Sequence, residues 1–153
     1  HDTAFVVAHF HYIVFGGTGF AFFAALHYWF PKIFGRMYDK AWANIGWLVF
    51  FIGFLALYTP MFYLGMIGMP RRYYDYLEEF HGANILSTFG SWILATGLII
   101  IIVNLVRSAS KGPKAGMNPW SGKTLEWTVP SPPPLENFDE IPELGEKDGP
   151  YNY

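Results

Sequence analysis

The chain contains no cysteine, and only 14% of its 153 residues are charged. Without thiols it can form neither disulfides nor the thiolate ligand sets of structural zinc sites and iron–sulfur clusters. A typical soluble domain has about 25% charged residues, whereas here 52% of the residues are hydrophobic and 20% are aromatic. The formal net charge of −2 provides no basic surface for nucleic acid. The composition therefore argues against a nucleic-acid partner and indicates a membrane protein.

The sequence also lacks an initiating Met and a basic-then-apolar leader that ends in a small-residue cleavage site. The first residue is His1, and an apolar run begins almost at once. Two interpretations fit this start: the chain is processed, or it is the C-terminal piece of a longer protein. We favour the second.

Three long stretches contain no Asp, Glu, Lys or Arg. Each is longer than the roughly 20 residues that a helix needs to cross a ~30 Å hydrocarbon layer. In lipid, helix is the form in which an open chain satisfies its own backbone hydrogen bonds. Three buried helices of a large soluble protein are the alternative, which so many uncharged runs in a short chain disfavour. The predicted spans are residues 3–30, 41–66 and 82–106.

The connections predict how these spans cross the membrane. Pro31 is expected to end the first span, and Gly68-Met69-Pro70 the second. The loop 32–40 and the segment after the third span are rich in Lys and Arg. The positive-inside rule then places that loop and the tail in the cytoplasm, with residue 1 and the loop 68–79 outside.

The character of the sequence changes after residue 107. Gly112-Pro113, Asn118-Pro119 and three consecutive prolines at 132–134 disfavour long helices. Residues 136–148 hold six acidic side chains and one Lys. The sequence therefore predicts two parts: a three-helix transmembrane segment, 1–107, and an extended cytoplasmic tail, 108–153, that lies along a surface.

Two histidines two residues apart lie inside the first predicted span. Successive residues of an α-helix are about 100° apart, so His9 and His11 point roughly 200° apart. They cannot chelate one metal, but each could hold a separate cofactor on opposite flanks of the helix. The alternative is two neutral histidines hydrogen-bonded to neighbouring helices. Gly16, seven residues after His9, is expected to lie about 20° off the face of His9 and to leave room for a flat cofactor.

Two further groups of side chains suggest binding. Adjacent guanidinium groups at Arg71 and Arg72 suit two carboxylates or phosphates; pairing with the loop acids at 75, 78 and 79, or with lipid headgroups, is the alternative. His1 and Asp2 could bind a divalent ion, which needs several more ligands. On its own this dipeptide is more simply a pair of surface residues.

Taken together, these blocks resemble the haem–copper terminal oxidases, most closely subunit I of the cytochrome c oxidases. The resemblance rests on His1-Asp2-Thr3 followed by 6–12 (Val-Val-Ala-His-Phe-His-Tyr), and on 68–73 (Gly-Met-Pro-Arg-Arg-Tyr). The tail segment Leu125-Glu126-Trp127 with the triple proline is similar to the family's C-terminal signature. The resemblance covers essentially the whole chain and implies an all-α integral membrane fold. The three predicted spans would then be the last three of about twelve helices.

The resemblance also implies a role for each candidate residue. His9 would be the axial ligand of the high-spin haem, where oxygen binds, and His11 an axial ligand of the low-spin haem, both of the haem A type. Arg71 and Arg72 would neutralise haem propionates on the route by which protons leave. His1 and Asp2 would help to hold a magnesium ion. The ligands of copper B belong to earlier helices, outside this chain.

The implied activity is the reduction of O2 to water with electrons from cytochrome c, coupled to proton translocation. The implied partners are the rest of subunit I, subunit II with its electron-entry copper site, subunit III, small subunits and the lipid bilayer. The implied location is a bacterial or mitochondrial inner membrane, with the tail on the cytoplasmic or matrix side. Two alternatives remain open: a quinol oxidase of the same superfamily, and a non-catalytic membrane subunit whose histidines are structural.

Overall fold

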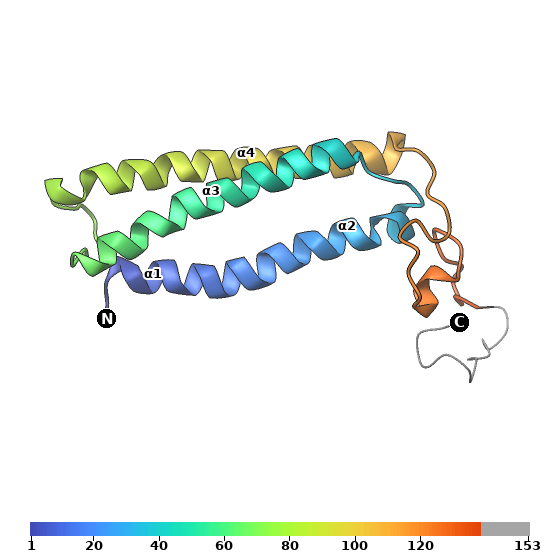
Figure 1. The fold of residues 1–153 in the computed structure, drawn as a ribbon, viewed down its shortest axis with the longest axis horizontal. Coiled ribbons are helices and arrows are strands. Elements are labelled where there is room, and N and C mark those ends of the chain that lie inside the picture. The colour runs from blue at the N-terminus through green and yellow to red at the C-terminus, as the bar shows by residue number, and fades with distance from the viewer. Residues whose placement is uncertain (139–153) are drawn as a thin grey trace. The chain divides into compact units, whose positions relative to one another are not determined.

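The computed structural model describes residues 1–138, and these are helical without any strand (Figure 1). Two isolated β-bridges, Thr3 with Pro70 and Arg36 with Lys114, occur outside the helices. The elements are α1 (Ala4–Phe10), the π-helix η1 (His11–Gly19), α2 (Phe20–Phe34), α3 (Lys40–Met66), the 3₁₀ turn η2 (Glu78–Phe80), α4 (His81–Lys111) and the 3₁₀ turn η3 (Leu125–Trp127).

The three predicted spans are present. Three apolar helical stretches are long enough to cross a membrane: Ala4–Phe34, Lys40–Met66 and Glu78–Lys111. One predicted boundary is wrong, because Pro31 lies inside α2 and the helix continues to Phe34. A proline in the last turn removes only one backbone donor. The helix ends instead at Gly35, which has a φ of +63° and whose N–H donates to the carbonyl of Pro31 at 2.8 Å.

The first span is continuous but not uniform. Its middle part, η1, is a π-helix of 9 residues between α1 and α2, with hydrogen bonds from i to i+5 where an α-helix has i to i+4. Glycine stands at 16, 17 and 19 within it, and glycine has low helix propensity, so the α-helical register has little intrinsic preference there. π-helical turns are uncommon and often mark functional positions.

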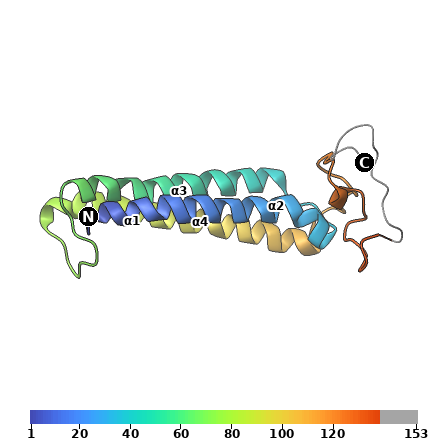
Figure 2. The same ribbon diagram turned by 90° about the horizontal axis from the view of Figure 1, so that it is seen from below.

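The chain divides into two compact units. Unit 1 comprises His1–Ala24 and Lys40–Asn104, and in it the helices lie side by side (Figure 2). Glycines allow close approach: a Cβ at Gly53 of α3 would overlap the backbone of Leu94 in α4, and one at Gly65 would overlap the backbone of Phe5 in α1. Small residues at helix crossings are the usual packing device in lipid, where hydrophobicity does not drive helices together.

One end of unit 1 has a small core and backbone ties. Its buried residues are Ala4, Leu64 and Phe80, with Met69, Tyr76 and Ala83 packed against them. The N–H of Ala4 donates to the carbonyl of Met69 at 2.9 Å, and the N–H of Arg71 donates to that of Asp2 at 3.0 Å. As predicted, α3 ends before Gly68, whose φ is +96°. The N-terminal residues and the loop after α3 therefore lie at the same end, as their predicted topology requires.

Unit 2 comprises Ala25–Asp39 and the chain from Leu105 onward. Its buried centre is Trp127, which is 1% exposed and donates from Nε1 to the hydroxyl of Tyr28 at 2.7 Å. Burial raises the pKa of the Tyr38 hydroxyl, and this ring packs edge-on against His27. The described part of the tail thus packs on the end of α2. The division of the chain at residue 107 stays a prediction, and residues 139–148 of its acidic segment lie outside the described residues.

Candidate functional site

His11 is held by a backbone hydrogen bond and by an aromatic ring. Its Nδ1 lies 2.8 Å from the carbonyl oxygen of Val7, one turn earlier. Because a carbonyl only accepts, Nδ1 is the donor in this contact, and Nε2 is the ring nitrogen that could ligate a metal. The imidazole also stacks on Tyr58 of α3, with ring centroids 4.3 Å apart and planes 18° apart. Histidines that ligate metals are usually oriented by this kind of second hydrogen bond.

His9 has a different environment. It is exposed, and within residues 1–138 it makes no hydrogen bond, ion pair or ring contact. His11, by contrast, is half-buried against α3. The two side chains therefore differ in exposure, and their separation by roughly 200° around the helix stays a prediction. In the alternative, both histidines would form hydrogen bonds to neighbouring helices. Within residues 1–138, His9 forms none.

The expectation for Gly16 is wrong. A Cβ at Gly16 would lie 3.4 Å from Cζ of Phe54, so this position faces α3 and not the open flank of His9. A Cβ at Gly17 would meet no atom within 4 Å. The error comes from assuming α-helical rotation through a stretch whose hydrogen bonds are π-helical.

Arg71 forms an ion pair that the sequence did not suggest. Its NH2 lies 2.6 Å from Oδ1 of Asp2, with side-chain exposures of 29% and 60%. The Nε atom of Arg71 is buried, and no hydrogen-bond partner for it is found among residues 1–138. The predicted alternative, pairing with acids of the following loop, does not occur in the described part of the chain. The nearest of those acids, Asp75, accepts from the N–H of Tyr76 instead.

Arg72 stands apart from this pair. It is exposed, its φ is +62°, and no ion pair to it exists within the part of the chain that the structure covers. A positive φ in a non-glycine residue is uncommon and turns the side chain away from the direction that an extended backbone would give. The two adjacent guanidinium groups are therefore not engaged by the same partner.

His1 and Asp2 are close to each other but do not complete a metal site. Nδ1 of His1 is 3.3 Å from Oδ2 of Asp2, and the two side chains are 97% and 60% exposed. No group of three or more His, Cys, Asp or Glu side chains gathers within residues 1–138. Mg²⁺ requires near-octahedral coordination, so these two side chains could supply only part of its ligands.

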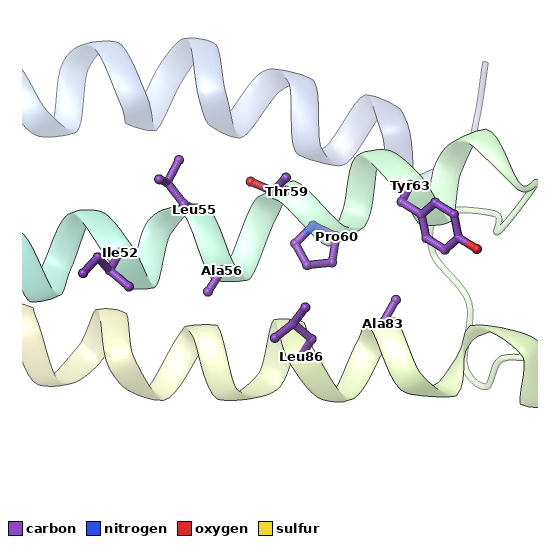
Figure 3. Close-up of a pocket in the computed structure, with 8 residues that line it drawn as sticks. All are labelled: Ile52, Leu55, Ala56, Thr59, Pro60, Tyr63, Ala83 and Leu86. Atoms are coloured by element: carbon purple, nitrogen blue, oxygen red, sulfur yellow. The ribbon is translucent and has the colours of Figure 1, made fainter.

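A hollow in unit 1 has little chemistry of its own. It has a volume of about 610 Å³ and lies along α3 and α4 (Figure 3). Of the polar groups on its wall, the hydroxyl of Thr59 is 2.7 Å from that of Tyr12. None of the candidate residues lines it. The lining residues are Ile52, Leu55, Ala56, Thr59, Pro60, Tyr63, Ala83 and Leu86.

Two partnerships at the site were not predicted: the contact of Tyr58 with His11, and that of Asp2 with Arg71. The first contact joins residues 47 positions apart and the second joins residues 69 positions apart. Neither has a local sequence signal. The described residues together form an all-α, multi-pass membrane protein, with two histidines on opposite flanks of its first helix and an arginine pair in the loop after its second.

Comparison with known proteins identifies the family. The model of cytochrome c and quinol oxidase polypeptide I matches residues 1–93, and the chain therefore belongs to this family of haem–copper oxidase subunits. It is similar to a C-terminal part of subunit I, as the sequence motifs predicted.

Three relatives give the extent of the similarity. The chain is 46% identical over 153 residues to cytochrome c oxidase subunit 1 of Synechocystis sp. and 43% identical over 153 residues to that of Thermostichus vulcanus, each match covering 100% of the chain and 27% of the relative. It is 43% identical over 145 residues to the Bacillus subtilis subunit, covering 93% of the chain and 23% of the relative. The chain thus spans about a quarter of the length of these relatives.

Proposed function

We propose that this chain is the C-terminal part of the catalytic subunit of a proton-pumping terminal oxidase, which reduces O2 to water with electrons from cytochrome c. The observation that carries the proposal is the pair of histidines on one helix. Nδ1 of His11 is hydrogen-bonded to the carbonyl of Val7, and the side chain of His9 is exposed. The names of the relatives, all cytochrome c oxidase subunits, support the choice of donor.

His9 and His11 fit the two axial positions assigned to them. A haem iron takes a lone pair from an imidazole nitrogen, and the contact of Nδ1 with Val7 makes Nε2 the nitrogen of His11 that could supply it. The stacked ring of Tyr58 restricts rotation of the His11 imidazole. His9, without a competing partner in residues 1–138, would ligate the high-spin haem. With copper B, whose ligands would lie on earlier helices, that haem would supply the binding site for O2.

Arg71 and Arg72 would hold the carboxylates of the haems. The buried Nε of Arg71, unpartnered among the described residues, would donate to a carboxylate oxygen in this proposal, because a buried donor without an acceptor is costly. Asp2 already binds NH2 of the same guanidinium. In this proposal the Asp2–Arg71 pair and the separate Arg72 would lie on the route by which protons leave.

Magnesium and the partners belong to the same proposal. His1 and Oδ2 of Asp2, which lie beside each other, would contribute two ligands to a magnesium ion whose other ligands would come from outside this chain. The remaining subunit I helices, subunit II with its copper, subunit III and the small subunits would surround the three spans. The basic loop 32–40 and the tail would face the cytoplasm or matrix, as the positive-inside rule requires.

The test uses the complete oxidase complex with His9→Ala and His11→Ala. We expect the His9 variant to lose the carbon-monoxide-binding haem and the His11 variant to lose the low-spin haem, each measured by pyridine haemochrome and carbon monoxide difference spectra. A His9→Ala complex that keeps full oxygen consumption would overturn the proposal and favour a non-catalytic subunit with structural histidines.

A quinol oxidase is the second candidate, because the matching family model describes both cytochrome c and quinol oxidases. The two share the helical core and differ in the donor. Oxygen consumption by the purified complex with reduced cytochrome c, compared with that supported by a quinol, separates them. Activity with the quinol alone would reject cytochrome c as the donor.

A further inference from the structure

We propose that Gly17 is the residue that leaves clearance beneath the His9 ligand, for the apolar edge of the macrocycle that His9 would hold. This inference rests on the proposed function and adds a positioning residue to the same site. Three observations carry it: the helical register of the first span, the surroundings of its three glycines, and the position of Arg71 at the opposite end of the His9 flank from Gly17.

The helical register points to Gly17. In an α-helix, two turns below His9 fall about seven residues later, at Gly16. From His11 onward, however, the helix is π-helical, so each turn holds more residues and two turns take about eight. The row of positions below His9 therefore passes through Gly17 and not through Gly16.

The surroundings of the glycines point to the same residue independently. A Cβ at Gly16 would contact Phe54 at 3.4 Å, and one at Gly19 would lie 3.2 Å from the ring of Phe15. Both positions are therefore enclosed by the protein's own aromatic side chains. Gly17 is exposed, and a Cβ there would meet nothing within 4 Å. Of the three glycines, it is the one whose Cβ position no described residue encloses.

The side chains between His9 and Gly17 define the shape of this flank. Ile13 and Val14, one turn below His9, are 62% and 60% exposed. They offer an apolar wall at the depth of a macrocycle face, whereas the next turn offers bare backbone at Gly17. The flank thus widens with distance from the end of unit 1 that holds Arg71.

The direction of this widening fits a macrocycle with one acidic edge. Asp2 and Arg71 are tied together at the N-terminal end of α1, and Gly17 lies on the other side of His9, at most about 12 Å along the axis. A macrocycle that turns its carboxylates toward the arginines turns its opposite, apolar edge toward Gly17. A branched side chain at position 17 would occupy the space that this edge needs.

The experiment compares Gly17→Ala, Gly17→Val and Gly17→Leu in the complete oxidase complex, with Gly16→Ala as the matched control. The readouts are the ratio of carbon-monoxide-binding haem to low-spin haem, and the amount of subunit in the membrane by immunoblot. We expect that ratio to be near normal for Gly17→Ala and at least twofold lower for Gly17→Leu, with Gly17→Val between them. In the Gly17 variants the low-spin haem spectrum and the amount of subunit should be unchanged. The Gly16→Ala control should have the same haem ratio as the unmodified complex.

Two outcomes would overturn the inference. If Gly17→Leu keeps both haems with normal spectra, no macrocycle edge lies over this residue. If Gly17→Leu loses both haems together or removes the subunit from the membrane, Gly17 is a helix-packing contact instead. The His9→Ala complex, measured in parallel, distinguishes a failure of the proposed function from a failure of the role of Gly17. Retention of the carbon-monoxide-binding haem there would overturn the proposed function, whereas its loss beside an intact Gly17→Leu complex would overturn only the role of Gly17.

Discussion

Lys32 in unit 2 and His9 in unit 1 are both polar side chains in an apolar helix, yet their surroundings differ completely. Lys32 is 6% exposed, and its ammonium group donates to the carbonyls of Met117 at 3.0 Å, of Pro130 at 3.4 Å and of Val129. Its charge also lies 5.2 Å from the centre of the Trp127 ring. His9 has no such partner among residues 1–138.

This contrast distinguishes polar groups that stabilise the fold from polar groups that have no partner among the described residues. An ammonium group has three donors, and Lys32 finds an acceptor for each within its own unit, so it stabilises the tail. The open imidazole of His9 and the orphaned Nε of Arg71 remain unsatisfied within the described chain. A buried or intramembrane polar group without a partner is costly, so these are the groups for which an external partner is expected.

The largest effect is expected from His9→Gly in the complete complex. Removing the side chain should abolish the carbon-monoxide-binding haem spectrum, because the axial nitrogen is lost. The change vacates the volume of an imidazole on a flank that no residue of 1–138 covers, so added imidazole should enter that space and restore part of the spectrum. His11→Gly should respond less to imidazole, because this position is half-buried between Phe10 and Tyr58. Equal rescue at both positions would contradict the contrast.

Lys32→Met should release the tail. The methionine fills similar volume but leaves three carbonyls without a donor, a loss on the order of 3 kcal/mol. We expect protease cleavage between residues 112 and 138 to become about 100-fold faster in membranes, because that free energy corresponds to two orders of magnitude in local opening. The control is Lys114→Met, at an exposed position. If both variants are cleaved at the rate of the unmodified protein, Lys32 does not hold the tail.

Arg71→Gln should have a moderate effect on the haems. Loss of a positive charge near a haem disfavours the reduced iron, so the haem reduction potential should become more negative. Spectroelectrochemical titration of the complex measures this shift. Arg107→Gln, whose exposed side chain belongs to unit 2, serves as the charge-matched control. An unchanged potential in Arg71→Gln would mean that its guanidinium does not contact a haem carboxylate.

The smallest effect is expected for Tyr28→Phe. This change removes the hydroxyl that accepts from Nε1 of Trp127 at 2.7 Å, and one lost hydrogen bond to a buried donor costs about 1 kcal/mol. The tail should then be cleaved about fivefold faster, well below the effect of Lys32→Met. Tyr63→Phe, at an exposed position of unit 1, is the control. An effect as large as that of Lys32→Met would mean that Trp127, and not Lys32, is the main anchor.

Much of the architecture was predictable because it follows from local composition. Long runs without charged residues can be only helices in lipid, and the spans were found where these runs lie. The positions of His9 and His11 on opposite flanks follow from a separation of two residues. The family followed from the His-Phe-His and Pro-Arg-Arg blocks together with their spacing.

The end of α2 and the partner of Arg71 could not be predicted in the same way. Pro31 is normally a helix terminator, but at the last turn its missing donor matters little, and Gly35 decides the end. Asp2 meets Arg71 only because α1 and the loop after α3 reach the same end of unit 1. The charges nearest to Arg71 in sequence were therefore the wrong candidates.

The sequence by itself determined that this chain is a three-span membrane protein of the oxidase family with two histidines on one helix. Three other matters depend on tertiary structure: Gly16 faces Phe54 of α3, Asp2 binds Arg71, and Lys32 anchors the tail. The physical reason is the same in each case. Hydrophobic runs and residue spacing act locally, whereas a change of helical register and a contact between distant segments depend on how the whole chain packs.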